Sequence, residues 1–185
     1  TSLLERIVEK AGNEKAMESL GLIRSASLQA VELSKQLLLF SRQQCVNLET
    51  CDLNEVVAEF VKMMRRMVEE TINLDVKLGV GLDQIKADRS MLGQVMMNLI
   101  LNARDAMPDG GRITIETSVR SRSAADKSIG PGDYACLSIR DNGSGIPPEK
   151  LPKIFDPFFT TKEKEKGTGL GLSNVAAIIR EHGGQ

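Results

Sequence analysis

The N-terminal part of the chain carries one long apolar stripe. Residues 14–44 read as a continuous helix whose apolar positions recur in steps of three and four: Ile23, Ala26, Ala30, Leu33, Leu37 and Phe40. This spacing is typical of a coiled-coil or helix-bundle seam, and the small alanines favour a close neighbouring helix. The stripe is too long for one short helix of the same chain to cover, so we predict a homodimer formed through these helices. A helix lying on its own domain is the alternative.

The rest of the chain alternates between helical and strand periods. The polar stretch 47–54 predicts an irregular linker, in which Asp52 or Asn54 is placed to cap the helix that follows. Asp88 or Ser90 is placed in the same way before a second helix. The periodicities predict helices over 55–69, 88–107, 148–155 and 172–181, and strands over 72–78, 112–119 and 133–140.

The helix that ends at Met107 carries a separate polar face. Asn98, Asn102 and Asp105 follow one another at i, i+4 and i+7, so they share one side of the helix. Amides and a carboxylate are costly to bury unless a polar group meets them. The apolar run 99–101 argues against a face that is simply solvated, so we expect a polar group to meet it.

Glycines stand at alternate positions in two further stretches. The stretch before the last helix exposes backbone N–H groups near a helix N-terminus and can wrap an anion, most often a phosphate. Its residues are Gly167, Thr168, Gly169, Leu170, Gly171 and Leu172. The second stretch follows a strand end, a common place for ligand groups, and holds Asp141, Gly143, Gly145 and Ile146. A flexible glycine linker is the alternative for the first stretch.

Composition narrows the function without naming it. With 24 basic and 25 acidic residues, the chain lacks the basic excess of a nucleic-acid-binding protein. No apolar run reaches the roughly 18 residues of a membrane span, and no signal peptide is visible. We therefore expect a soluble, cytoplasmic chain that itself touches neither nucleic acid nor membrane; it could be the cytoplasmic part of a membrane-anchored sensor. A P-loop or dinucleotide site is excluded, because the chain has no Gly-Lys-Ser/Thr and its glycine run opens no βαβ unit.

Four stretches in a fixed order resemble a known family. They are Asn98-x-x-x-Asn102-x-x-Asp105, Asp141-x-Gly143-x-Gly145, Phe155-Asp-Pro-Phe-Phe and Gly167-x-Gly169-x-Gly171. Together they resemble the N, first glycine, F and second glycine boxes of sensor histidine kinases, within the fold shared with gyrase, Hsp90 and MutL. The resemblance implies an α+β fold, a two-layer α/β sandwich in which a mixed sheet packs on helices. It places a partial dimerisation hairpin at 1–46, a linker at 47–54 and an ATP-binding kinase domain at 55–185.

The resemblance also implies residue roles. Asn102 would ligate Mg²⁺ through its amide oxygen, and Asn98 would lie near the phosphates of ATP. Asp141 would accept a hydrogen bond from the adenine amino group, and Ile146 would form an apolar wall for the purine. The glycine-rich stretch 167–172 would cradle the triphosphate. Lys162 and Lys166, in a lid over 160–166, are either phosphate contacts or solvated loop charges.

The chain departs from the family pattern at both ends. No histidine precedes His182, so the phosphoacceptor histidine is absent, and we interpret His182 as structural or as a helix C-terminal charge. The family continues beyond the position of Gln185 into two further strands, so we expect the sheet to lack them. We therefore predict ATP binding without self-phosphorylation, in a kinase that passes phosphate to a histidine and then to a response-regulator aspartate. The alternatives are another ATPase or a serine kinase of the same fold, or a non-catalytic dimerisation module.

Overall fold

The computed structural model describes residues 15–17, 19–21, 46–65, 71–123, 130–162 and 167–185. The chain divides into two compact units, Thr1–Gln44 and Cys45–Gln185. In the first unit, the described residues 15–17 and 19–21 are helical, as the periodicity predicts. The apolar stripe from Ile23 to Phe40 lies outside the described residues, so the dimerisation seam stays a prediction.

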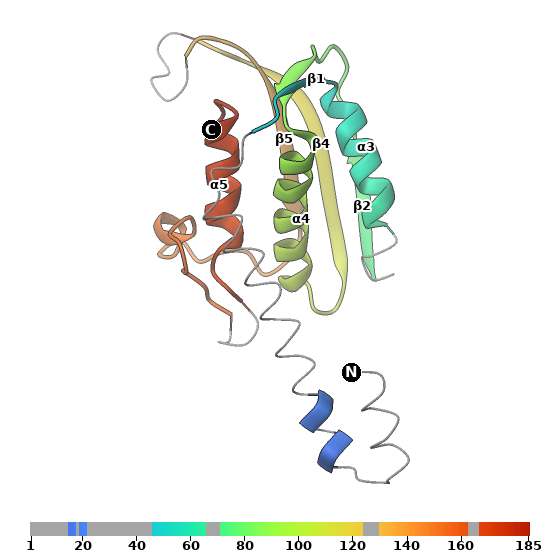
Figure 1. The fold of residues 1–185 in the computed structure, drawn as a ribbon, viewed down its shortest axis with the longest axis vertical. Helices are drawn as coiled ribbons and strands as arrows, with labels where there is room; N and C mark the ends of the chain where they lie inside the picture. Colours follow the sequence, from blue (N-terminus) through green and yellow to red (C-terminus); the bar gives the residue numbers. More distant parts are fainter. Residues whose placement is uncertain (1–14, 18, 22–45, 66–70, 124–129, 163–166) are drawn as a thin grey trace. The chain divides into compact units, whose positions relative to one another are not determined.

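The second unit holds helices and strands in mixed order (Figure 1). The strands are β1 (Glu49–Cys51), β2 (Ile72–Lys77), β3 (Ile85–Ala87), β4 (Gly111–Arg122) and β5 (Gly132–Asp141). The helices are α3 (Leu53–Met64), α4 (Arg89–Asp105), α5 (Gly171–Glu181) and a short 3₁₀ turn, η1 (Leu151–Lys153). Among the described residues, no helix is long and apolar enough to cross a membrane.

The larger sheet is mixed and has the order β2-β4-β5. β2 runs parallel to β4, because α4 carries the chain back across the sheet between them, and β4 pairs antiparallel with β5. Ile113 and Ile115 on β4 are fully buried and face the helices, while Arg112 and Thr114 alternate with them and so face the other side. The helices lie over one face of this sheet (Figure 1), which confirms the predicted mixed sheet packed on helices.

A second, two-stranded sheet corrects the expected linker. β1 pairs antiparallel with β3, with Thr50 opposite Lys86, so the segment 47–54 is not irregular. Asp52 then caps α3 by accepting a hydrogen bond from the backbone N–H of Asn54 at 2.7 Å. The Asn54 side chain is used elsewhere: it donates to the carbonyl of Gly79 and accepts from the hydroxyl of Thr117, which is buried.

The core lies on both sides of α4. One cluster fills the space between α3, α4 and the sheet, and includes Val57, Met64, Met96 and Ile100, each at most 1% exposed. A second cluster joins α4 to α5 through Met91, Val95, Val175 and Ile178. Because α4 contributes to both clusters, its polar face is held in a fixed position relative to α5.

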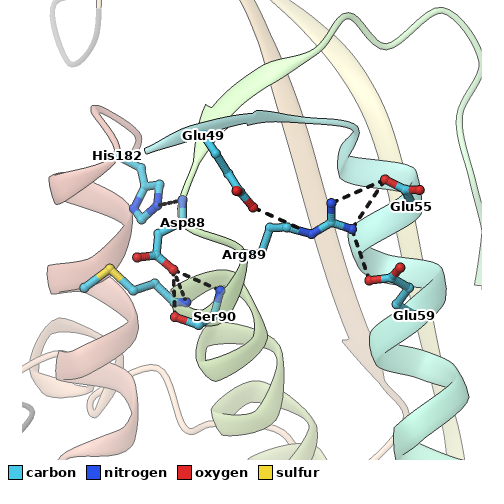
Figure 2. Close-up of polar contacts among 8 residues, drawn as sticks. Glu49, Glu55, Glu59, Asp88, Arg89, Ser90 and His182 are labelled. Carbon is cyan, nitrogen blue, oxygen red and sulfur yellow. Dashed lines mark hydrogen bonds and ion pairs between the residues drawn. The ribbon is translucent and has the colours of Figure 1, made fainter. Parts of the chain in front are cut away.

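Charged groups fix the first turn of α4 (Figure 2). Arg89 lies between β1 and α3, with its guanidinium 3.0 Å from Glu59, 3.4 Å from Glu55 and 4.0 Å from Glu49. Asp88 is the N-cap and accepts from the backbone N–H groups of Ser90 and Met91. These contacts join α4 to its neighbours on both sides.

His182 closes the same end of the unit. Its Nε2 accepts from the backbone N–H of Asp88 at 3.0 Å (Figure 2), and its Nδ1 lies 2.8 Å from the carbonyl oxygen of Ile178. Since Nε2 accepts, Nδ1 carries the proton and donates to Ile178. The imidazole therefore docks the end of α5 on the start of α4, as the structural interpretation of His182 predicts.

Several predicted boundaries move. The helix expected over 148–155 is only the η1 turn, with Pro152 inside it. β4 and β5 extend further than expected, to Arg122 and from Gly132, because the two strands pair along their whole length. α5 begins at Gly171, one residue before the predicted start.

Candidate functional site

The polar face of α4 meets a lysine from a distant part of the chain. Lys162 Nζ donates to Asp105 Oδ2 at 2.7 Å and to Asn102 Oδ1 at 3.2 Å. The side chains of Lys162 and Asp105 are both about one-third exposed, so the contact is half-screened from water. The polar group that the sequence leads us to expect on this face is thus an ammonium.

Asp105 is ionised in this setting. Partial burial acts to raise the pKa of its carboxyl, but hydrogen bonds and charges from Lys162 and Arg104 outweigh burial and lower the pKa below its usual value. Arg104 contributes through its Nε and Nη2, at 3.0 and 2.8 Å from Asp105 Oδ1. The end of α4 therefore presents a carboxylate and an amide oxygen to a single cation.

The glycine-rich stretch packs against the same face. A Cβ added to Gly171 would lie 3.7 Å from Asn102 Nδ2 and 4.0 Å from Asn98 Oδ1. The N-terminus of α5 therefore lies next to both amides, at a distance where an added Cβ would make ordinary van der Waals contact with them. This juxtaposition joins the first and last of the four sequence stretches.

Gly169 closes the loop onto the segment before it. It has a φ of 67°, and its carbonyl accepts a hydrogen bond from the N–H of Phe158 at 2.9 Å. A Cβ at Gly169 would lie 2.3 Å from the carbonyl carbon of Phe158. Phe158 also has a φ of 67°. A left-handed backbone is uncommon for a bulky residue such as Phe158. Phe158 and Gly169 are therefore both conformationally constrained at the point where their backbones meet.

The stretch after β5 is attached to the C-terminal end of α4, the end that carries Asn102 and Asp105. Asp141 Oδ1 accepts from the N–H of Gly143 at 2.9 Å, a local turn that fixes the loop. A Cβ at Gly143 would lie 2.7 Å from the carbonyl oxygen of Ala106, the C-cap of α4, which also accepts from the N–H of Ser144. The second glycine, Gly145, has a φ of 71° with open space around it, and Ile146 is 48% exposed.

The structure brings most predicted site residues to one helix. Asn98, Asn102 and Asp105 lie on α4, next to Gly171 and Lys162, and Gly143 contacts the residue that follows α4. Thr168 and Leu170 belong to the same loop, where the Leu170 N–H donates to the Thr168 hydroxyl, and Leu172 is half-buried in the first turn of α5. Within the described ranges, no hydrogen bond or ion pair joins the Asp141 carboxylate to Asn102 or Gly169. Lys166 lies outside the described residues.

Two supporting residues are not among those that the sequence analysis predicts. Thr160 accepts from the N–H of Lys162 through its hydroxyl, and a Cβ at Gly167 would lie 2.6 Å from that hydroxyl oxygen. Asn142 accepts from the N–H of Arg112 at 2.8 Å and so ties the loop after β5 to the start of β4. The Thr160-x-Lys162 turn is readable as a hydroxyl turn, but the reach of Asn142 depends on pairing that only the fold reveals.

A family model described as histidine kinase-, DNA gyrase B- and HSP90-like ATPase matches residues 87–185. The chain belongs to this ATPase family. The matched residues include α4, both glycine stretches and α5, so the family assignment and the contacts above concern the same part of the molecule.

Relatives with curated names are sensor histidine kinases. The sensor kinase CckA of Brucella abortus is 45% identical over 168 residues, which cover 88% of this chain and 18% of CckA. The sensory histidine kinase/phosphatase NtrB of Rhizobium meliloti is 30% identical, over 97% of this chain and 48% of NtrB. This ATPase domain thus spans between about a fifth and a half of these relatives.

A solved structure agrees with the fold. The nucleotide-free catalytic domain of histidine kinase ThkA is 32% identical and superposes with a TM-score of 0.57, over 73% of this chain and 81% of that domain. The predicted resemblance to histidine kinases is therefore confirmed by sequence and by structure.

Proposed function

We propose that the chain is the ATP-binding domain of a sensor histidine kinase. It would bind ATP along α4 and pass the γ-phosphoryl group to a histidine outside this sequence, and from there to an aspartate of a response-regulator receiver domain. The observation that carries the proposal is the meeting of Asn98, Asn102 and Gly171: the polar face of α4 lies directly beside a glycine-rich helix N-terminus. Exposed N–H groups at such an N-terminus suit phosphate oxygens.

The oxygen atoms at the end of α4 fit a magnesium ion. The ammonium of Lys162 donates hydrogen bonds to Asn102 Oδ1 and Asp105 Oδ2, so these two oxygens already contact a cationic group in this structure. Mg²⁺ prefers oxygen ligands and borrows further ones from phosphates and water. Asn102 would hold the ion, which when bound would offset the negative charge of the triphosphate.

Separate groups would hold the base and the phosphates. The Asp141 carboxylate has one oxygen engaged by Gly143, which leaves the other free to accept from the adenine amino group. Asn98, Lys162 and the N–H groups of 167–172 would meet the phosphates, with Lys166 as a further candidate. Such positioning and charge neutralisation supply most of the catalysis of phosphoryl transfer.

The partners follow from the same assignment. A sensor kinase acts on a receiver domain, and the apolar stripe from Ile23 to Phe40 suits a homodimer. Both partners are proposals for the whole protein, of which this domain is a part.

Calorimetric titration with ATP tests the proposal. ATP with Mg²⁺ should bind the parent chain, and Asp141→Ala should bind it at least about tenfold more weakly, the loss expected for one hydrogen bond to a charged group. GTP should bind the parent poorly, because guanine has a carbonyl where adenine has its amino group. Asp83→Ala is the matched control, since Asp83 is exposed in the turn before β3. Equal ATP affinities of the parent and Asp141→Ala would refute the proposed base contact.

A further inference from the structure

The face of the sheet that looks away from the helices carries a pocket. It has a volume of about 390 Å³, opens to solvent, and is lined by Asn73, Gly111, Arg112, Thr114, Arg140, Asp141 and Asn142. This volume lies within the range of small-molecule sites, roughly 300–1,000 Å³. The pocket shares Asp141 with the proposed adenine contact, but no residue of α4, α5 or the glycine-rich stretch 167–172 lines it, so it is separate from the proposed phosphate and magnesium contacts.

Strand register explains why polar side chains gather there. Asn73 pairs with Arg112, and Thr114 pairs with Arg140, so these four side chains lie side by side on one face. Asp141 pairs instead with the buried Ile113, which places its side chain toward the helices. The register therefore directs Arg140 and Asp141 to opposite faces of β5, although Asp141, at the end of the strand, still lines the pocket.

The guanidinium groups of Arg112 and Arg140 are available to bind a ligand. Within the described part of the chain, neither Arg112 nor Arg140 forms a side-chain hydrogen bond or an ion pair, and both residues are exposed. Asp75, the acid on β2 opposite Thr114, also forms no ion pair with them. Asn142 is anchored, because its amide oxygen accepts from the Arg112 N–H, which leaves its amide nitrogen free to donate.

Charge on this face is strongly uneven. The outward positions of β2, β4 and β5 include five basic residues, Lys77, Arg112, Arg120, Arg122 and Arg140, against two acidic ones, Asp75 and Glu116. Lys77 and Glu116 form an ion pair at 3.0 Å, so the positive charge beside the pocket belongs to Arg112 and Arg140. The whole chain has a formal net charge of −1, which makes this face an exception.

We propose that this pocket binds the phosphate group of a small phosphate ester. Two guanidinium groups, a hydroxyl and two amides line it and can donate hydrogen bonds, against the single carboxylate of Asp141. A phosphate, with three terminal oxygens and a double charge, uses so many donors better than a carboxylate does. The pocket is larger than a bare phosphate needs, which leaves room for the organic part of the ester.

Amide chemical shifts in an NMR titration test the site. Inorganic phosphate and glycerol 3-phosphate should each move the amides of Asn73, Thr114 and Asn142, while sodium chloride at the same ionic strength should not. Tighter binding of glycerol 3-phosphate than of inorganic phosphate would support a phosphate ester as the ligand. Equal binding of the two would overturn the claim that the ligand is an ester. The proposal of a phosphate site as a whole fails if these amides stay still, if chloride moves them equally, or if shifts occur only in 167–172.

Single-charge variants provide the matched comparison. Arg112→Gln and Arg140→Gln should each weaken binding by about tenfold, the loss of one charge-assisted fork. Arg120→Gln, which removes the same charge from the opposite end of the same face, should bind like the parent. Equal weakening by all three would indicate a diffuse charge effect and would overturn the site. Each spectrum also shows whether the variant is folded.

Discussion

The substitution Gly169→Ala perturbs the proposed phosphate loop at one defined contact. The added methyl would lie 2.3 Å from the carbonyl carbon of Phe158, and backbone atoms cannot move aside as a flexible side chain can. The φ of 67° at Gly169 adds about 1 kcal/mol for any residue with a Cβ. Overlap with the neighbouring backbone adds roughly 1–3 kcal/mol.

Separation of the two segments would relieve this strain. Movement of Gly169 away from Phe158 breaks their 2.9 Å hydrogen bond and shifts the loop relative to α4. If restoring the loop position that binds ATP costs the variant about 2 kcal/mol, its affinity for ATP drops by about 30-fold. The core clusters around α4 do not include Gly169, so the fold should persist.

Gly81→Ala is the matched control for this prediction. Gly81 has a φ of 75°, but open space surrounds the position of its Cβ, and it lies in the turn between β2 and β3. Both variants would be compared by calorimetric ATP titration and by thermal unfolding. We expect a larger loss of Tm in Gly169→Ala, because its overlap with Phe158 adds to the φ penalty that both variants carry, and a loss of ATP affinity in Gly169→Ala alone. Equal ATP affinities in the two variants would refute the role of the Gly169–Phe158 contact.

Three further predictions concern the contacts around α4. Lys162→Gln should speed amide hydrogen exchange at residues 160–162 about fivefold through loss of a half-exposed ion pair worth about 1 kcal/mol, whereas Lys86→Gln should leave it unchanged. Asp88→Ala should lower the free energy of unfolding by about 1 kcal/mol at neutral pH. Burial acts to raise the pKa of the Asp88 carboxyl, but hydrogen bonds from Ser90, Met91 and Asn47 lower the pKa overall. The carboxylate therefore stabilises the fold fully above the unfolded-state pKa and loses this effect as the pH falls. In urea titrations, the difference in unfolding free energy between the parent and Asp88→Ala should shrink below about pH 4. Radiolabelled ATP should leave no acid-labile label on the chain, since its single histidine, His182, is held by Asp88 and Ile178; label on His182 would contradict this.

The sequence predicts the larger helices and strands because their periods are long enough to read. The alternation around Ile113 and the stripe through Met96 mark buried faces directly. The pairing of β1 with β3 could not be predicted in this way, because each strand has only three residues and shows too little alternation, and the two strands are far apart in the chain. Pattern alone therefore predicts a linker where the fold forms a sheet.

The candidate site divides in the same way. The spacing of Asn98, Asn102 and Asp105 places them on one helical face, which requires only the geometry of a helix. The bridge from Lys162 to Asp105 spans 57 residues, and Phe158 has its positive φ where its backbone is hydrogen-bonded to Gly169. Neither feature has a local signature, because Lys162 meets a residue of α4 and Phe158 meets Gly169, and both partners are far away in the chain.

A single NMR titration with ATP and Mg²⁺ tests the central claim most directly. We predict that the side-chain amide of Asn102 and the backbone amides of Gly143 and Gly169 shift together, with one common dependence on ATP concentration. Gly81, in the turn between β2 and β3, should not move. Shifts that follow different affinities, or that leave any of the three groups unchanged at saturation, would contradict a single nucleotide site along α4.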